Sequence, residues 1–334
     1  MNNKKFLIFG SNSFSGSHFV KKALKLGYEV LGISRSNLPQ KVFLPYKWEN
    51  FHHEGTFKFK QLDLNKNLPE IIYEIDYFKP SYIVNFAAQG MVAESWLDPT
   101  HWYQTNLLSQ VALHDELRKK DFIKSYVHFT TPEVYGSTDQ GWINENARFC
   151  PSTPYAVSRA ACDLHLKSFF EAYDFPVIFT RAANVYGPGQ QLYRIIPKTI
   201  LSARSGKKME LHGGGGSIRS FIHINDVIEA TFQLAVSGKP GSSWHLSTKD
   251  SISIKDLVEK ICTLCDVDFK SIVEVSEERL GKDKNYLLDS SKIREDFGWE
   301  EKISLERGIK ETISWIDENY DLLCKMPWIY KHKK

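Results

Sequence analysis

Four side chains in two short segments could together carry out acid–base chemistry. Thr131 and Glu133 lie in the run Thr-Pro-Glu-Val-Tyr-Gly, and Tyr155 and Arg159 follow it. Tyr155 and Arg159 are four residues apart, so a helix would place them on one face. A tyrosine titrates at about pH 10 and serves as a base only where its phenolate is favoured. Arg159 can supply the positive charge that favours the phenolate. Glu133 adds a carboxylate, which can accept a second proton.

The elements that would position these groups form an alternating α/β pattern. Lys5–Phe9 predicts a strand, Ser17–Leu26 a helix and Tyr28–Ile33 a second strand, which together make a βαβ unit of a parallel sheet. The continued alternation predicts a Rossmann-type, doubly wound sheet, with Thr131 at the carboxyl end of a strand, where ligands bind. The further strands are Tyr82–Phe86, Ser125–Phe129 and Val177–Thr180, and the main helices between them are Thr105–Lys119 and Ala156–Tyr173.

The pattern changes after about residue 184, where loops rich in glycine and proline replace the regular alternation. We predict a dinucleotide-binding Rossmann domain over residues 1–184 and a smaller α+β region over residues 185–334, which would cover the substrate and which the family resemblance given below makes mainly a sugar-nucleotide-binding domain. Phe221–His223 and Ser243–Leu246 could return to the first sheet. Segments near residues 220–250 are therefore expected to belong to the first domain.

The turn between the first strand and the first helix is suited to a phosphate group. Gly10 and Gly16 bound this turn, where backbone N–H groups and the helix dipole favour an anion. The second strand ends in Ser34, Arg35 and Ser36 instead of an acidic residue. A guanidinium beside two hydroxyls suits a 2′-phosphate, so these residues favour NADP over NAD.

Taken together, these segments resemble the extended short-chain dehydrogenase/reductases, the NAD(P)-dependent nucleotide-sugar epimerases and dehydratases. The turn resembles Gly-x-x-Gly-x-x-Gly with Ser13 as the middle residue, and Tyr155 to Arg159 resembles Tyr-x-x-x-Lys. The pattern is closest to the GDP-mannose and dTDP-glucose 4,6-dehydratases. This resemblance implies a cofactor site made of Gly10, Asn12, Ser13, Phe14, Ser15, Gly16, Ser34, Arg35, Ser36, Asp63, Leu64, Phe86, Ala87, Ala88, Gln89, Asn106, Tyr155 and Arg159.

The second half of the chain contains further segments that resemble the family. Asn184 lies in an Arg-x-x-Asn-x-Tyr-Gly-Pro segment, and Arg219 follows a glycine run and precedes Phe221. The resemblance implies that Arg219 clamps the diphosphate of a nucleoside-diphosphate sugar, and that Arg279 is a second candidate for the phosphates or the base. The predicted substrate-binding residues are Gln89, Glu94, Thr131, Asn184, Arg219, His245 and Arg279.

The same resemblance implies a reaction. Tyr155 and Thr131 would handle the proton of the sugar 4-hydroxyl, and Glu133 would take the C5 proton before water leaves C6. We therefore predict a nucleotide-sugar 4,6-dehydratase that makes a 4-keto-6-deoxy sugar nucleotide with tightly bound, recycled NADP, NAD being the alternative. Arg159 replaces the usual lysine, and Pro132 replaces an Asp of the dTDP-glucose type and would fix the backbone that presents Glu133. A 4-epimerase, a uronate decarboxylase and a catalytically weakened binding protein stay open.

Composition narrows the function classes further. The 334 residues carry a net charge of +3 with both signs interspersed, so no nucleic-acid partner is predicted. No run approaches the roughly 20 apolar residues that span a bilayer, so no membrane partner is predicted either. Five cysteines, an odd number, favour reduced thiols in the cytoplasm.

Two further expectations concern metals and partners. Cys262 and Cys265 form a Cys-x-x-Cys without a second pair, so no metal site is predicted. The final residues, Lys331 to Lys334, are expected to be a solvated tail. The resemblance implies a homodimer, formed through a bundle that contains the Tyr155 helix and the Thr105 helix.

Overall fold

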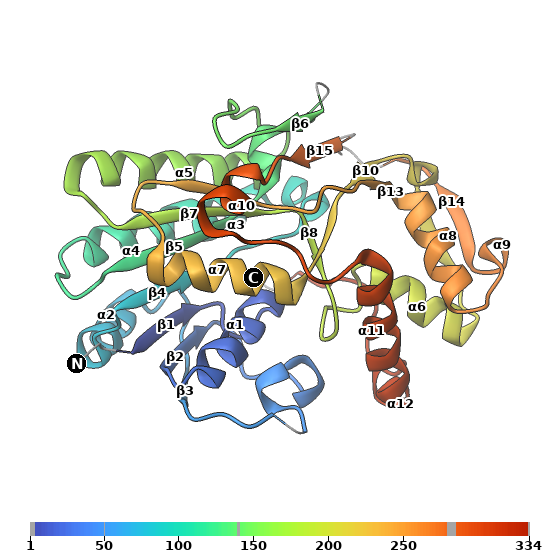
Figure 1. Cartoon of the computed structure of the whole chain (residues 1–334), viewed down its shortest axis with the longest axis horizontal. Coiled ribbons are helices and arrows are strands. Elements are labelled where there is room, and N and C mark those ends of the chain that lie inside the picture. Colours follow the sequence, from blue (N-terminus) through green and yellow to red (C-terminus); the bar gives the residue numbers. More distant parts are fainter. Residues whose placement is uncertain (1–3, 50, 139–140, 279–284, 333–334) are drawn as a thin grey trace.

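The computed structural model describes residues 4–49, 51–138, 141–278 and 285–332. Seven strands of these residues form the main sheet, and all neighbours in it are parallel (Figure 1). The predicted doubly wound fold is therefore confirmed. In spatial order the strands are β12 (Ser243–Leu246), β7 (Val177–Ala182), β5 (Ser125–Thr130), β4 (Tyr82–Asn85), β1 (Lys5–Phe9), β2 (Glu29–Ser34) and β3 (Thr56–Gln61).

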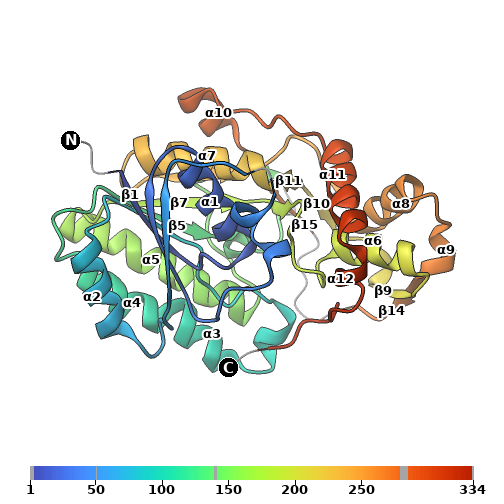
Figure 2. The ribbon, with the colours of Figure 1, turned by 90° about the horizontal axis from the view of Figure 1, so that it is seen from below.

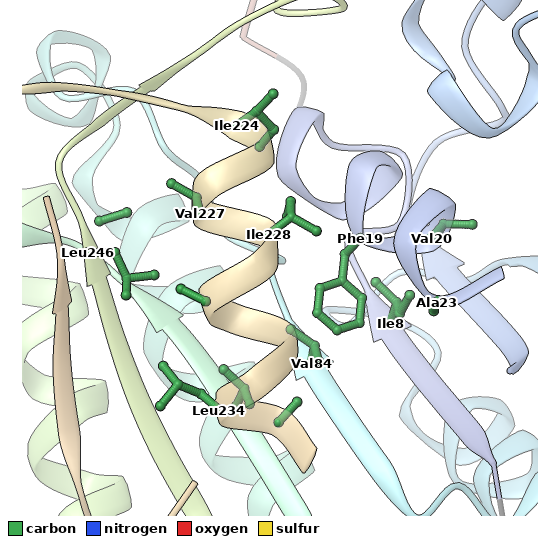
Figure 3. Close-up of a cluster of buried hydrophobic side chains, with 14 of the residues drawn as sticks. Ile8, Phe19, Val20, Ala23, Val84, Ile224, Val227, Ile228, Leu234 and Leu246 are labelled. Atoms are coloured by element: carbon green, nitrogen blue, oxygen red, sulfur yellow. The ribbon is translucent and has the colours of Figure 1, made fainter. Parts of the chain in front are cut away.

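Helices cover both faces of this sheet, so its central strands are buried on both sides. Phe6, Leu7, Ile8 and Phe9 of β1 all have 0% exposed surface, which explains why this strand is apolar throughout. One face is covered by α1 (Phe14–Lys25) and α7 (Ile224–Ser237), which pack on each other and on the sheet in Figure 3. The other face carries α2 (Leu68–Phe78), α4 (Ser109–Leu117) and α5 (Pro154–Tyr173), with α3 (Pro99–Tyr103) beside α5.

Most of the remaining elements form a smaller lobe, on the right of Figure 1. Three small sheets of the described residues belong to or border it: β8 (Asn184–Tyr186) with β11 (Phe221–His223); β14 (Val273–Ser276) with β9 (Met209–His212); and, in order, β13 (Ile252–Ser253), β10 (Ile218–Arg219), β15 (Asn285–Leu288) and β6 (Trp142–Ile143). The further helices are α6 (Ile195–Ser205), α8 (Ile254–Leu264), α9 (Phe269–Ile272), α10 (Ser291–Phe297), α11 (Leu305–Glu318) and α12 (Tyr320–Leu323). Of these, α10 packs against β12 of the main sheet.

One of the two segments expected to return to the first sheet does so. Ser243–Leu246 pairs with β7 as the edge strand β12, as predicted. The expectation for Phe221–His223 is wrong, because β5 and β12 already occupy the two edges of β7. Phe221–His223 pairs instead with β8, the short strand that follows β7. The division near residue 184 stays a prediction.

Short irregular helices connect these elements. The predicted helix Thr105–Lys119 begins with a π-helical turn, Gln104–Leu108, and continues as α4. The 3-10 turns of the described residues are Lys41–Phe43, Pro45–Lys47, Ala93–Trp96, Pro132–Tyr135 and Gly213–Gly215. Among the helices described, none combines the length and the apolar composition needed to cross a bilayer.

Candidate active site

A cavity of about 710 Å³ lies at the carboxyl ends of the central strands and extends into the smaller lobe. This is the edge at which parallel α/β sheets bind ligands. Its wall brings together more than half of the distinct positions proposed from the sequence. These are Ser13, Phe14, Ser15, Arg35, Phe86, Ala88, Gln89, Thr131, Glu133, Tyr155, Arg159, Asn184 and Arg219.

The turn after β1 has the close packing that a dinucleotide site needs. A Cβ atom on Gly16 would lie 2.1 Å from the carbonyl oxygen of Gly10, so only glycine lets α1 begin so near the strand. Gly10 itself has a φ of +73°, in the left-handed region. Ser13 replaces the middle glycine and caps α1, because its Oγ accepts a hydrogen bond from Gly16 N at 3.0 Å. The turn therefore fits a pyrophosphate, with a hydroxyl added to the backbone donors.

The end of β2 is tied to this turn. Asn12 N donates to Ser34 Oγ at 3.0 Å, and Asn12 Nδ2 donates to Ser36 O at 2.9 Å. These bonds fix the backbone on both sides of Arg35, whose side chain lines the cavity. Asn12, Ser34 and Ser36 thus position the guanidinium that could meet a ribose phosphate.

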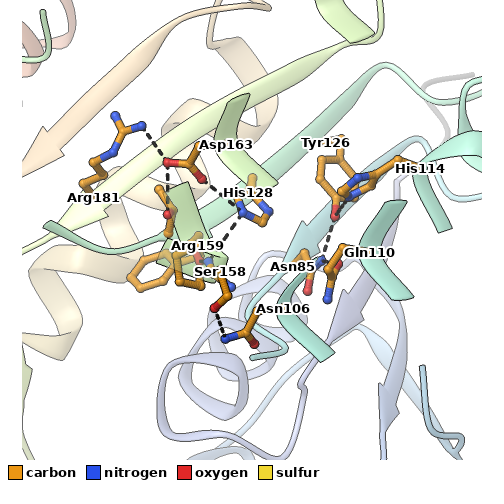
Figure 4. Close-up of polar contacts among 12 residues, drawn as sticks. Asn85, Asn106, Gln110, His114, Tyr126, His128, Ser158, Arg159, Asp163 and Arg181 are labelled. Carbon is orange, nitrogen blue, oxygen red and sulfur yellow. Dashed lines mark hydrogen bonds and ion pairs between the residues drawn. The ribbon is translucent and has the colours of Figure 1, made fainter. Parts of the chain in front are cut away.

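Some predicted residues support the cavity from behind. Asn106 Oδ1 accepts from Gln89 N at 2.8 Å, and Asn106 Nδ2 donates to Gln89 O and to Ser158 Oγ, both at 3.1 Å. Figure 4 shows the Asn106–Ser158 contact. Asn106 therefore ties the loop after β4 to α5. The predicted residues that do not line the cavity are Gly10, Asn12, Gly16, Ser34, Ser36, Asp63, Leu64, Ala87, Glu94, Asn106 and His245.

His245 and Arg279 need separate comment. The structure does not bring His245 to the cavity, because its buried ring is held between Tyr135 OH at 2.8 Å and Asp289 O at 3.1 Å. Burial lowers the pKa of His245 to about 3, so the ring is neutral. Arg279 lies outside the described residues.

Glu133 is presented by a 3-10 turn, Pro132–Tyr135. Thr131 is extended, as residues before proline prefer, and its hydroxyl accepts from Glu133 N at 3.4 Å. Pro132 stands first in the turn, where no N–H is needed. The substitution of proline is thus compatible with presenting Glu133 into the cavity.

Tyr155 stands in the first turn of α5, which Thr153 caps by accepting from Ala156 N at 3.1 Å. Its side chain is 9% exposed. Burial raises the pKa of Tyr155 above its usual value and the Glu133 charge raises it further, whereas Arg159 and a hydrogen bond with Thr131 act in the opposite direction. Glu133, Thr131 and Arg159 therefore all act on the same phenol.

Arg159 is almost completely buried and belongs to a polar network that Figure 4 shows. Its Nη2 donates to Phe129 O and lies 3.5 Å from His128 Nε2, which is 3.4 Å from an oxygen of Asp163. Arg181 Nη2 donates to the other oxygen of Asp163 at 2.7 Å. Two guanidinium groups and one carboxylate leave this buried cluster with an excess of positive charge.

The charges of this network are fixed by their surroundings. Burial alone would raise the pKa of Asp163, but Arg181 and His128 hold that pKa below its usual value. Burial lowers the pKa of His128 to about 4, and the charges of Arg159 and Arg181 act in the same direction, against the opposing effect of Asp163. Asp163 is therefore ionised and His128 neutral near pH 7.

The sequence prediction missed several residues of the cavity wall. Arg194 and Lys198 stand four residues apart at the start of α6, and the charge of Arg194 acts to lower the pKa of Tyr155. Their spacing of four residues, which places two cations on one face of a helix, was the available signal. Tyr286 could not be found in this way: its ring lies 4.2 Å from the Arg219 guanidinium, and its hydroxyl donates to Asn184 Oδ1 at 2.9 Å.

The chain that forms this cavity is similar to known nucleotide-sugar dehydratases. Residues 7–312 match the model of the family described as GDP-mannose 4,6 dehydratase. The dTDP-D-glucose 4,6-dehydratase of Homo sapiens is 28% identical over 323 residues, which are 95% of this chain and 91% of the relative. A trifunctional enzyme of Arabidopsis thaliana, whose name begins with UDP-glucose 4,6-dehydratase, is 30% identical over 95% of this chain. The chain spans 47% of that relative's length.

Solved structures of similar proteins share the whole fold. The dTDP-glucose 4,6-dehydratase of Bacillus anthracis, in complex with NAD, has a TM-score of 0.85 and 27% identity, over 95% of this chain and 98% of that one. The dTDP-glucose 4,6-dehydratase DesIV of Streptomyces venezuelae, with NAD bound, has a TM-score of 0.86 and 26% identity, over 95% and 98% of the two chains.

Proposed function

The chain belongs to the GDP-mannose 4,6-dehydratase family, and we propose that it is a nicotinamide-dependent nucleotide-sugar 4,6-dehydratase. The observation that carries the proposal is the position of Glu133. Its carboxylate lies on the same cavity wall as Thr131 and Tyr155, near enough for its charge to raise the pKa of Tyr155. An oxidation at C4 needs only the tyrosine and its partners, whereas elimination across C5 and C6 needs a second base.

The residues divide the reaction between them. Tyr155, assisted by Thr131, takes the proton of the 4-hydroxyl while C4 is oxidised. The C4 ketone acidifies the C5 proton, which Glu133 removes, and the same carboxyl group returns a proton to the departing 6-hydroxyl. A bound nicotinamide dinucleotide would supply the hydride acceptor for C4 and the hydride donor for C6. C5 would regain a proton as C6 is reduced, which balances the proton that Tyr155 took from the 4-hydroxyl. Arg159 supplies positive charge that favours the phenolate of Tyr155.

The smaller lobe supplies groups for the nucleoside diphosphate. Arg219 and Asn184 line the cavity and are linked through Tyr286, while Arg194 and Lys198 add two further cations. Guanidinium groups suit diphosphate oxygens because they donate parallel hydrogen bonds. This concentration of positive charge supports a nucleoside-diphosphate sugar as the substrate.

Incubation with GDP-mannose, dTDP-glucose, UDP-GlcNAc and UDP-glucuronate, read by product mass, tests the proposal. We expect loss of water from one of the hexose nucleotides. Glu133→Gln should stop that loss while leaving oxidation at C4 detectable as the absorbance of reduced nicotinamide. Loss of carbon dioxide would identify a decarboxylase, and an unchanged mass with an inverted C4 would identify an epimerase. Full dehydration by Glu133→Gln would overturn the assignment of Glu133.

For the cofactor we propose NADP, with NAD as the alternative. The glycine turn fits a dinucleotide, and Arg35 lines the cavity at the end of β2, where a 2′-phosphate would lie. The two solved dehydratases described above contain NAD, which makes the choice a sharp test. Arg35→Ala should weaken NADP binding about tenfold and leave NAD binding within a fewfold range. Equal weakening of both would contradict the role of Arg35.

We propose that the protein works in the cytoplasm as a homodimer. The odd number of thiols suits a reducing compartment. Val157 and Leu164 are two helical turns apart on α5 and are 38% and 56% exposed, and Leu108 before α4 is also 56% exposed. A second copy would cover this apolar stripe. Leu164→Glu should halve the mass measured by light scattering, whereas Tyr77→Glu, on the exposed face of α2, should leave it unchanged.

A further inference from the structure

The C-terminal segment of the chain returns to the first lobe and docks beside α3. Figure 2 shows the chain passing from α12 to this position. The ring of His332 stacks on the buried ring of Trp102, with centroids 4.7 Å apart and planes 18° from parallel. His332 Nε2 lies 2.8 Å from His101 Nδ1. The expectation of a solvated tail is therefore wrong for His332, because its ring packs on Trp102 and contacts the imidazole of His101.

A carboxylate completes a set of three potential metal ligands. One oxygen of Asp98 and one nitrogen each of His101 and His332 all lie within 4.8 Å of one another. Two imidazoles and a carboxylate suit zinc, cobalt and nickel, whereas magnesium and calcium prefer oxygen ligands alone. We propose that Asp98, His101 and His332 bind one divalent transition-metal ion, of which zinc is the best match to these ligands.

The geometry requires only a small adjustment. Two nitrogens bound at about 2.0–2.1 Å to a tetrahedral zinc ion lie about 3.3 Å apart. The observed separation of 2.8 Å must therefore widen by about 0.5 Å, and the Asp98 oxygen, which lies within 4.8 Å of both nitrogens, must come to a similar distance from them. Rotation of the three partly exposed side chains provides both changes. A water molecule would fill the fourth position.

The other ring nitrogen of His332 is already engaged. His332 Nδ1 lies 3.2 Å from Tyr330 OH, and a proton on Nδ1 leaves the lone pair of Nε2 facing His101. Histidines that bind metals are oriented in this way by a partner on the second nitrogen. Trp102, which has 0% exposed surface, holds the ring plane from one side.

Metal binding here would also fix part of the cavity wall. Tyr330 lines the cavity and packs edge-on against Tyr193, with centroids 5.3 Å apart. An ion held by His332 would therefore keep Tyr330 in place, two residues away along the chain. This consequence for the cavity rests on the proposed function, whereas metal binding by the three ligands does not.

Titration of the chelator-treated full-length protein with Co²⁺ tests the site, because cobalt reports its ligands by visible absorption. We expect one tightly bound Co²⁺ ion per chain, and Zn²⁺ should displace it. Competition with a chromophoric chelator measures the affinity of the site for each ion. His332→Ala should weaken binding at least about tenfold, and so should His101→Ala. His332 is partly exposed and belongs to none of the buried hydrophobic clusters, so its replacement should leave folding intact. His52→Ala, at an exposed histidine remote in sequence from the three ligands, is the matched control and should bind cobalt like the wild type.

A second measurement reports the position of the tail. Zn²⁺ should slow tryptic cleavage after Lys331 in the wild type and in His52→Ala, but not in His101→Ala. Unchanged cobalt affinity and spectrum in His332→Ala would overturn the proposal. Absence of any bound cobalt in the wild type would also overturn the proposal. The contact between His101 and His332 would then be a hydrogen bond that only holds the tail in place.

Discussion

The two ends of the cavity are assembled in different ways. At the chemical end, Thr131 and Glu133 follow β5 directly and Tyr155 stands in the first turn of α5, so short segments of chain set their geometry. At the substrate end, Asn184, Arg219 and the tyrosine between them come from three separate strands, β8, β10 and β15. Local structure thus positions the reacting groups, and tertiary packing positions the binding groups. Substitutions at the first end should change the rate, and those at the second end the affinity.

The largest effect is expected from Tyr155→Phe. Removal of the phenolic hydroxyl removes the base for C4 oxidation, so kcat should fall by about 10²–10⁴-fold with little change in KM. Steady-state kinetics with the preferred nucleotide sugar measures it. Tyr193→Phe is the matched control, because Tyr193 lines the same cavity at its substrate end, and its kcat should stay within a fewfold range. Equal kcat for Tyr155→Phe and the wild type would contradict the mechanism.

Asp163→Asn should have the next largest effect, on stability. The substitution leaves two buried guanidinium groups without their carboxylate, which costs about 3–5 kcal/mol in the free energy of unfolding. Denaturant titration measures this. Asp317→Asn removes the partner of Arg204 at the surface, where the carboxylate is 44% exposed, and should cost less than about 1 kcal/mol. Similar losses in the two variants would show that burial does not govern the Asp163 pair.

The same network contributes to the pH dependence of stability. His128 has a pKa of about 4 in the folded protein, against 6.5 for an exposed ring. Between these two pH values the ring is protonated in the unfolded chain but neutral in the folded protein, so the unfolded state binds more protons. Stability should therefore fall between pH 6.5 and about 4. The carboxylate of Asp163 has a lowered pKa, so its contribution is lost only at more acidic pH. Replacement of His128 by Asn should reduce the first of these losses by the share of this one histidine, because His245 and other buried histidines also have lowered pKa values.

At the substrate end, Arg219→Lys should raise KM about tenfold and leave kcat nearly unchanged. Lysine lacks the planar fork that pairs with a diphosphate and stacks on Tyr286, so only binding is weakened. Arg204→Lys, at the surface, is the control. A fall in kcat at constant KM would contradict the division between the two ends.

The same contrast decides what the sequence could predict. Thr131, Glu133, Tyr155 and the glycine turn depend on a strand end, a helix cap or a tight turn, all of which have local signatures. The sheet itself followed from alternating apolar runs. Tyr330 reaches the cavity from the far end of the chain, a placement that only packing determines.

Two sequence predictions disagree with the structure because tertiary packing, and not local sequence, determines where the residues lie. His245 stands on β12 and is predicted to bind the substrate, yet its ring faces Tyr135 inside the protein. Phe221–His223 is as apolar as a strand of the main sheet, but both edges of β7 are occupied. Neither outcome is encoded within a few neighbouring residues, so no local pattern could have predicted it.

Arg159→Lys is expected to have the smallest effect. It keeps the positive charge at the chemical end but changes the shape of the group that carries it, so it tests the two contributions separately. The Arg159 guanidinium is held by Phe129 O and His128, whereas a lysine ammonium is compact and can move toward Tyr155. Only deprotonated Tyr155 accepts the 4-hydroxyl proton, so kcat/KM rises with pH through the pKa of this tyrosine, which burial raises. A nearer positive charge lowers that pKa, so activity should be retained or raised and its rise should move to lower pH. Arg159→Gln, which removes the charge, should move it to higher pH. A shift of both variants in the same direction would show that the charge of residue 159 does not control Tyr155.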